Sequence, residues 1–214
     1  MKTDQLIDSL VADHAARPRP ALLSVWPLAA LAMLIDLALF LPTLGPRPDL
    51  LSAIGTWRFD AKLLVTGLLA AVSILLLQRL RRPQPARAIS RSLKWLLLPA
   101  LLLALLVGAE LLMVPADLWR ARAMGTNVVV CLPAITAMGL PLIPLLSEAL
   151  RRGAPSRPTL SGAVAGLAAG SIAALFYASH CTSDSPLFIA SWYGLAIGGL
   201  ALAGALWGRF VLRW

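Results

Sequence analysis

The stretch 95-WLLLPALLLALLVGAELLMVP-115 carries a single charged residue, Glu110, in 21 positions. A helix needs roughly 20 mostly apolar residues to cross the hydrocarbon core of a bilayer, so this stretch is long enough to span one. Five further stretches of similar character occur, at 22–42, 61–79, 126–148, 159–179 and 187–208. The fourth span, 126–148, contains Pro133, Pro141 and Pro144, which predict a kink or a local break. The sequence therefore predicts an all-α polytopic membrane protein, a bundle of six transmembrane helices.

The overall composition supports the same class. Hydrophobic residues make up 59% of the 214 positions and charged residues only 14%, whereas soluble domains are about a quarter charged. The net charge of +9 does not indicate nucleic acid, because no basic run is interleaved with aromatics and no zinc-finger pattern occurs. The motifs of the common hydrolases, zinc proteases and nucleotide-binding enzymes are also missing. We expect the lipid bilayer as a partner, no direct contact with nucleic acid, and no enzymatic activity.

Basic residues predict the orientation of the spans, because Lys and Arg near span ends stay in the cytoplasm. Six spans place both chain ends on one side. That side would carry fourteen of the nineteen basic residues, and the other side five, namely Arg47, Arg58, Lys62, Arg120 and Arg122. Both termini are therefore predicted to be cytoplasmic, and the inner connection at 80–94 is predicted to be a basic loop.

The first twenty residues, MKTDQLIDSLVADHAARPRP, differ from the rest of the chain. Their acidic residues argue against a cleavable signal peptide, whose start would be basic, so the segment is expected to be retained. A short amphipathic helix is predicted, with a stop signal in the Arg-Pro repeats. Its exposed stripe suggests docking onto a partner or onto the cytoplasmic face of the protein itself. The sequence thus divides into a cytoplasmic amphipathic segment, 1–20, and a six-helix transmembrane domain, 21–214.

Glycines recur at four-residue spacing in the last two spans, a pattern that permits close approach of helix backbones in lipid. Two interpretations are open: tight packing of the fifth span against the sixth, or a homodimer interface. The rows are Gly162, Gly166 and Gly170 in the fifth span, and Gly194 and Gly198 with Gly204 and Gly208 in the sixth.

The chain has two cysteines, Cys131 and Cys181, which are predicted to lie at similar levels near the outer ends of spans four and five. Three interpretations remain open. The thiols form a structural disulfide or stay inert, they respond to oxidants or metals, or they exchange disulfides catalytically, although no C-x-x-C motif is present. In the second case His180 and Asp184 could complete a site for a thiophilic metal ion bound transiently, with no obligatory cofactor.

Three acidic residues are predicted within the spans: Asp36, Glu110 and Glu148. Ionisable groups at this depth are costly and normally face a partner or a cavity. Lys62 is the predicted partner of Asp36, and Glu148 is predicted to reach towards Arg151 and Arg152. The alternative is a polar pathway, which would make the protein a transporter of ions or small solutes in the inner membrane.

The opening decapeptide MKTDQLIDSL, the six spans and the placement of the two cysteines together resemble the negative regulator of sigma F (NrsF) family, six-span bacterial anti-sigma factors. The resemblance implies a protein of the bacterial inner membrane that sequesters an extracytoplasmic-function sigma factor. It also implies release under heavy-metal or oxidative stress, sensed by periplasmic Cys131 and Cys181. We expect the sigma factor to bind the apolar stripe and aspartates of the first helix, a mode known for helices in grooves. Those residues are Asp4, Leu6, Ile7, Asp8, Leu10 and Val11.

Overall fold

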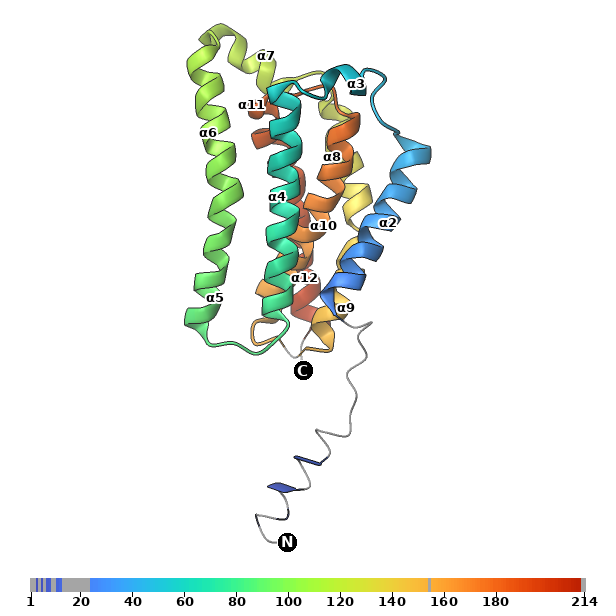
Figure 1. Cartoon of the computed structure of the whole chain (residues 1–214), viewed down its shortest axis with the longest axis vertical. Coiled ribbons are helices and arrows are strands. Elements are labelled where there is room, and N and C mark those ends of the chain that lie inside the picture. Colours follow the sequence, from blue (N-terminus) through green and yellow to red (C-terminus); the bar gives the residue numbers. More distant parts are fainter. Residues whose placement is uncertain are drawn as a thin grey trace.

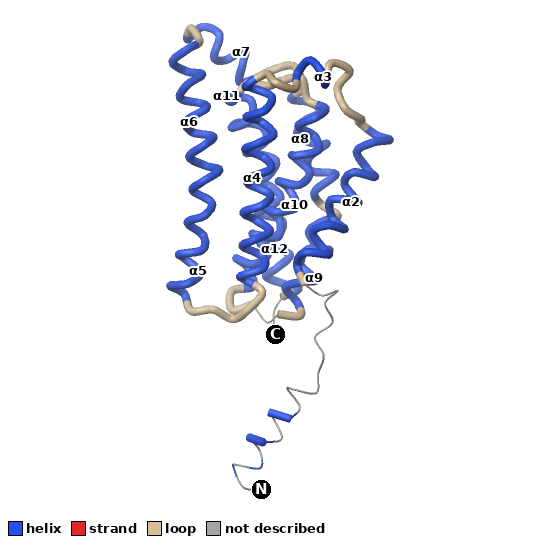
Figure 2. The backbone as a smooth tube through the Cα atoms, in the orientation of Figure 1, coloured by secondary structure: helices blue, strands red, loops and turns tan. Residues whose placement is uncertain are grey.

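A computed structural model describes residues 24–153 and 155–212, together with residues 3, 5, 7, 8, 11 and 12. These residues form helices and connecting loops without any strand (Figure 2). Six helical stretches are long and apolar enough to cross a membrane, which confirms the predicted all-α bundle of six spans. The first stretch is α2 (Val25–Thr43), and the last finishes with α12 (Gly194–Val211). The start of α2 and the end of α12 lie at the same end of the bundle (Figure 1).

Five of the six observed spans are longer than the predicted ones, and the first, with 19 described residues, is slightly shorter. The remaining elements of the spans are α4 (Trp57–Leu80), α5 (Ala86–Leu93), η2 (Lys94–Leu96), α6 (Leu97–Met113), α8 (Val128–Gly139), α9 (Leu142–Arg151), α10 (Pro158–His180), α11 (Pro186–Phe188) and the π-helical turn η4 (Ile189–Tyr193). Three short helices lie in the loops: α3 (Leu50–Ala53), η3 (Ala116–Leu118) and α7 (Trp119–Met124).

Most of the predicted loop 80–94 is helical, because α5 runs through η2 into α6. Helix α5 is amphipathic: Ile89 and Ser92 are buried, while Arg87 and Arg91 are exposed. Charged residues on one face lower the hydropathy of this segment, but they do not prevent it from being helical. The third span is thereby extended by more than two turns.

Helix α10 is the centre of the bundle and contacts α2, α4, α8, α9 and α12. A side chain on Gly162 or Gly166 would overlap the backbone carbonyl of Gly204 or Leu200 in α12, and Gly208 is equally confined by α10. Gly162, Gly166 and Gly208 therefore allow span five to pack closely against span six. Gly194 and Gly198, in contrast, have open space beside them, so they take no part in that contact. The homodimer remains a prediction.

The fourth span is broken, as its prolines predict. Helix α8 ends at Gly139 and α9 begins at Leu142, with Pro141 as its N-cap. The Leu140 amide donates to the Thr136 carbonyl at 3.0 Å. Pro141 and Pro144 have no amide hydrogen with which to continue the helical ladder.

The third span stands apart from the others, with α6 beside α4 (Figure 1). Its leucines at 97, 98, 101, 105 and 112 are all exposed. Apolar side chains on the outside of a spanning helix are what contact with lipid tails requires.

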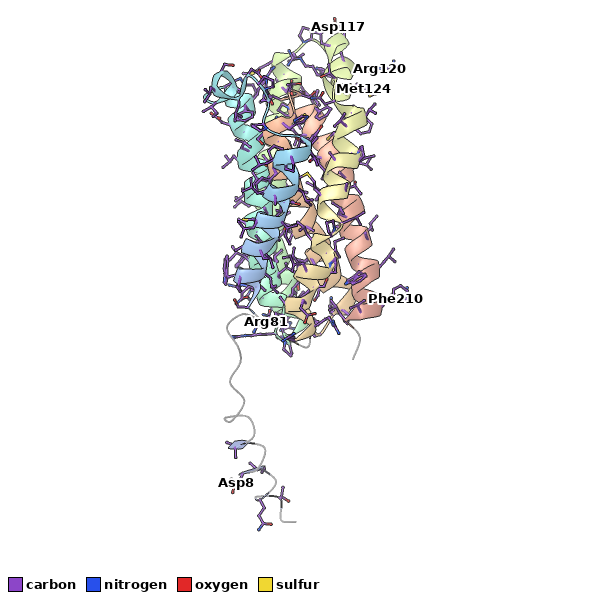
Figure 3. All side chains as sticks on the ribbon, turned by 90° about the vertical axis from the view of Figure 1, so that its right-hand side faces the viewer. Asp8, Arg81, Asp117, Arg120, Met124 and Phe210 are labelled. Carbon is purple, nitrogen blue, oxygen red and sulfur yellow. The ribbon has the colours of Figure 1, made fainter. Side chains whose placement is uncertain are left out.

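The bundle has two ends that differ in composition. The cysteine end is formed by residues 44–56, 114–127 and 181–185, and the terminal end is where α2 begins and α12 ends. Ile7, Asp8 and Val11 are helical and exposed, and Asp8 lies clear of the bundle, beyond the end that carries Arg81 and Phe210 (Figure 3). Asp4, Leu6 and Leu10, also predicted to bind the partner, lie outside the described residues.

Candidate functional site

The two cysteines meet at the cysteine end. Cys131 lies in the first turn of α8, and its amide donates to the Asn127 carbonyl at 2.8 Å. The Asn127 side-chain amide in turn donates to the Cys181 sulfur at 3.6 Å. Cys181 caps α10 through a 3.0 Å hydrogen bond from its amide to the Tyr177 carbonyl. The thiols are free and fully buried, and they lie at the same level of the bundle, as the sequence predicts.

Aromatic side chains surround the thiols. The rings of Tyr177 and Tyr193 are fully buried with centroids 5.9 Å apart, and Phe188 packs against Tyr193 at 6.2 Å. The tyrosine hydroxyls lie close enough to both thiols to interact with them electrostatically. Within the described part of the chain neither hydroxyl has a partner in hydrogen-bonding geometry. The thiol pair thus occupies a largely apolar pocket that water does not reach.

The loop that follows Cys181 is held by two cations. The fully buried Lys62 ammonium donates to the Asp184 carboxylate and, at 2.7 Å, to the Cys181 carbonyl. Arg47 donates to the other Asp184 oxygen at 2.8 Å and pairs with Asp49 at 2.7 Å. We call Arg47, Lys62 and Asp184 the ionic clamp. It fixes the backbone next to a cysteine, because Asp184 is only three residues from Cys181.

Local structure explains the position of these cations. The Arg47 amide donates to the Ser179 carbonyl at 3.0 Å, which brings the first loop against the end of α10. Phe59, which is fully buried, lies 5.8 Å from the Arg47 guanidinium and 5.1 Å from the Lys62 ammonium, within the range of cation–π attraction. The hydrogen bonds from Arg47 lower the pKa of Asp49, and those with Asp49 and then Asp184 raise the pKa of Arg47 itself.

Glu110 holds the loop from the opposite side. Its carboxylate is fully buried; one oxygen accepts from Arg122 at 2.9 Å and lies 3.7 Å from Arg58. The other oxygen accepts from the Ser185 hydroxyl at 2.8 Å and from the Leu187 amide at 3.4 Å. The segment 181–185 is therefore fastened to α4, α6 and α7 by charged groups.

One predicted ion pair is wrong. Lys62 pairs with Asp184 rather than with Asp36, because it lies near the start of α4 and reaches the α10–α11 loop. The Asp36 carboxylate is fully buried in α2, and no hydrogen-bond partner for it occurs in the described residues. Glu148 does reach its predicted partners, at 3.2 Å for Arg151 and 2.9 Å for Arg152.

The four residues suggested for a metal ion are not gathered into one site. The His180 ring is hydrogen-bonded to the Gly45 carbonyl at 2.9 Å, and Asp184 is engaged by the ionic clamp. No group of three or more His, Cys, Asp or Glu side chains suited to a metal occurs in the described part of the chain. Of the four, Cys131 and Cys181 lie close enough to interact electrostatically, so a thiophilic ion would have these two sulfurs as its protein ligands here.

Several residues of the site are not evident from the sequence. Arg47 and Asp49 lie in a loop with no motif, and Asn127 lies at the start of the predicted fourth span without any distinguishing pattern. The nearest signal is the presence of Asp184 three residues after a cysteine. It does not identify the two cations that bind it, because they are more than 120 and 130 residues away in the chain.

The fold and the site together define a polytopic helical membrane protein with a buried thiol pair and an ion-paired loop at one end. A family model described as "Negative regulator of sigma F" matches residues 10–214. The anti-sigma-F factor NrsF of Caulobacter vibrioides (strain NA1000 / CB15N) is 35% identical over 225 residues, and the probable anti-sigma-F factor NrsF of Azospira oryzae (strain ATCC BAA-33 / DSM 13638 / PS) is 32% identical over 229, each across the full length of both chains. No solved structure matches. The chain belongs to the NrsF family of anti-sigma factors, so its role is regulatory and its partner is a sigma factor.

Proposed function

We propose that this protein holds a sigma factor of the extracytoplasmic-function class at the bacterial inner membrane. Heavy metals or oxidants acting on Cys131 and Cys181 release it. The family supports the anti-sigma role, and the adjacency of the two thiols supports the sensing role. In this proposal the cysteine end faces the periplasm and both termini are cytoplasmic, since the terminal end carries most of the basic residues.

The observation that carries the proposal is the position of the thiol pair beside the ionic clamp. An oxidant that joins the sulfurs takes up two electrons, two protons leave, and the new bond fixes the sulfurs about 2.05 Å apart. A thiophilic cation would displace the same protons and bind both sulfurs. Either event withdraws the Cys181 sulfur from Asn127 and changes the loop that Lys62 and Glu110 hold.

The energy available from such chemistry is sufficient. A switch from 99:1 bound to 99:1 free needs about 5.5 kcal/mol of differential stabilisation. Structural zinc sites with four protein ligands, twice the number here, release about 10–16 kcal/mol on binding zinc at pH 7. A fraction of that energy, expressed as a change in packing between α8 and α10, is enough to redirect the equilibrium.

The sigma factor is held at the other end. Ile7, Asp8 and Val11 are exposed and Asp8 stands clear of the bundle, as a segment that docks into a partner's groove must (Figure 3). The apolar positions Leu6 and Leu10 and the acidic Asp4 complete this proposed hook. Substituting Leu6 and Leu10 by aspartate should abolish co-purification of the sigma factor.

Cysteine substitutions in cells test the sensing role. The single variants Cys131→Ser and Cys181→Ser and the double variant should fold, but they should change the induction of a sigma-dependent reporter by metals or oxidants. Ser171→Ala, which alters a buried hydroxyl in α10, is the matched control and should respond normally. Unchanged induction in the double variant would remove the sensing role while leaving the anti-sigma role intact.

Orientation is tested on a chain without its native cysteines. Asp117→Cys lies on the exposed surface of the cysteine end and Asp8→Cys beyond the terminal end (Figure 3). A membrane-impermeant maleimide should label position 117 in intact cells and position 8 only after lysis. The reverse result would contradict the proposed topology.

Transport of an ion or small solute is not favoured by the site. A pathway needs polar groups at successive depths of one cavity. Glu110 is instead committed to Arg122 and Ser185, and Asp36 has no polar partner in the described residues. Flux in proteoliposomes that depends on Asp36 or Glu110 would restore the transporter interpretation.

A further inference from the structure

A polar cavity of about 580 Å³ lies beside the ionic clamp at the cysteine end. Two guanidinium groups and a series of hydroxyl groups line it, together with the start of α4 and the end of α7. The N-terminus of a helix carries the positive end of its dipole, which adds to the charge of the arginines. The lining includes Thr56, Arg58, Arg122, Thr126, Ser183 and Asp184.

The two arginines have more donors than acceptors. Arg58 and Arg122 share one oxygen of Glu110, at 3.7 and 2.9 Å, although each guanidinium offers five N–H donors. The Arg58 Nε is buried, and no acceptor for it occurs in the described residues. The Arg58 guanidinium is also held in place by Trp57, whose ring centroid is 5.1 Å away. These donors are positioned for an acceptor that the described part of the chain does not supply.

Charge counting leads to the same conclusion. The ion pairs formed by described residues at this end join four cations with three carboxylates. Asp184, the acidic residue in the cavity lining, is already neutralised by Lys62 and Arg47. Asp60, in the first turn of α4, accepts from the Gly55 amide at 3.4 Å instead of reaching the cavity lining. Within these ion pairs one positive charge is left over, where Arg58 and Arg122 share the Glu110 carboxylate.

We propose that this cavity binds a small oxyanion, a phosphate or sulfate group, between Arg58 and Arg122. Planar guanidinium groups match the oxygen geometry of such anions and bind them through paired, charge-assisted hydrogen bonds. The hydroxyls of Thr126 and Ser183 line the same volume and can donate to the anion, whereas the Thr56 hydroxyl donates to the Ala53 carbonyl at 2.7 Å. The group is either free in solution or carried by the headgroup of an anionic lipid.

Binding there would act on the thiol loop, a consequence that rests on the proposed sensing function. An oxyanion competes with Glu110 for both arginines, and Glu110 is the acceptor that fixes Ser185 and the Leu187 amide. When the arginines attract one Glu110 oxygen less, the carboxylate becomes more mobile, and its other oxygen holds Ser185 less firmly. The cavity would thus supply a second input to the loop that carries Cys181.

Binding is tested on the purified full-length chain, without the sigma factor, so the result does not depend on the proposed function. Titration calorimetry in detergent micelles measures sodium sulfate and inorganic phosphate against sodium chloride at matched ionic strength. We expect saturable binding of sulfate or phosphate. Arg58→Gln should weaken the affinity about tenfold or more, because it removes a charge-assisted hydrogen bond. Arg58→Lys keeps the charge but lacks the planar guanidinium, so its affinity should lie between those of the parent and Arg58→Gln.

The matched control is Arg120→Gln. Arg120 is an exposed arginine on α7, two residues from Arg122, and it does not line the cavity (Figure 3). It should leave the affinity unchanged, whereas Arg122→Gln should lower it. If Arg120→Gln weakens binding as much as Arg58→Gln does, or if Arg58→Gln has no effect, the attraction is nonspecific and the site is wrong.

A second arm separates the two sources of the anion. Thermal unfolding is compared in nanodiscs of phosphatidylglycerol and of phosphatidylcholine. Stabilisation by phosphatidylglycerol that Arg58→Gln removes assigns the site to a lipid headgroup, and saturable binding in micelles assigns it to a free oxyanion. The absence of both effects in the folded wild-type chain would overturn the proposal.

Discussion

The ionic clamp gives the most direct prediction, since Asp184→Asn removes a charge from a pair whose other member cannot reach water. The Lys62 ammonium is fully buried, and its acceptors in the described structure are the Asp184 carboxylate and the Cys181 carbonyl. Arg47, the second partner of Asp184, retains Asp49. The substitution therefore leaves Lys62, and not Arg47, with its charge uncompensated.

The magnitude follows from these partners. Breaking a buried ion pair by removing one member costs about 3–5 kcal/mol, because a charge is left behind. The low end, about 3 kcal/mol, applies here, since asparagine still offers an oxygen and the Asp184 side chain is 18% exposed. Lys62→Met should cost less, about 1–2 kcal/mol, because Asp184 keeps Arg47. The double variant should be destabilised no more than Asp184→Asn alone, because it leaves no unpaired charge buried.

The assay reads the opening of the loop through the Cys181 thiol. In a Cys131→Ser background Cys181 is the remaining thiol of the chain, and it is fully buried. Where opening precedes a slow alkylation, its rate follows the opening equilibrium, so about 3 kcal/mol corresponds to roughly a hundredfold faster labelling. Asp117→Asn, an exposed acid at the same end, is the control and should label at the parent rate.

Two results would refute the reasoning. Labelling of Asp184→Asn at the parent rate would mean that the clamp does not hold the loop. Additive effects of Lys62→Met and Asp184→Asn would mean that the two side chains do not act as a pair, because a direct interaction makes the double variant milder than the sum.

Three further predictions concern packing, a buried acid and pH. Gly166→Ala should lower thermal stability in detergent by about 2 kcal/mol or more, because its methyl group overlaps a carbonyl of α12, whereas Gly198→Ala, with open space beside it, should be neutral or stabilising. Glu110→Gln should destabilise by about 3 kcal/mol in the same assay, since two arginines lose their shared carboxylate. Hydrogen bonding to Arg47 lowers the pKa of Asp49, so the stability that this carboxylate contributes is present above its unfolded pKa and is lost as pH falls through the folded value. The thermal stability of Asp49→Asn should therefore decline less below about pH 4 than that of the parent.

The spans could be predicted from the sequence because the membrane imposes one dominant requirement, a long apolar run. The break in span four was equally accessible, since Pro141 and Pro144 cannot donate backbone hydrogen bonds. Helix α5 was missed because Arg87 and Arg91 lower the local hydropathy while Ile89 still packs inward. Hydropathy measures transfer into lipid and does not detect a helix that extends a span with charged residues on one face.

The site was only partly predictable. The common level of Cys131 and Cys181 follows from counting residues along adjacent spans, which needs no knowledge of side-chain direction. The partner of Lys62 could not be found in this way, because its distance from Asp184 depends on how a loop folds over the bundle. Asp36 is predicted as the partner of Lys62 because both residues lie at a similar depth in the membrane. Depth does not determine which face of a helix contacts which neighbour.

The structure also constrains how a change at the thiols could reach the terminal end. Helix α10 is continuous, and its glycines lock it against α12, so it transmits little internal rearrangement. Span four is divided: α8 carries Cys131 in its first turn, and α9, beyond the break at Leu140 and Pro141, packs against α2. The two halves can change their mutual angle more easily than the turns of an intact helix, because Pro141 and Pro144 donate no backbone hydrogen bond at the break. In the proposed mechanism α9 therefore passes the displacement of α8 to α2, the helix that follows the first twenty residues.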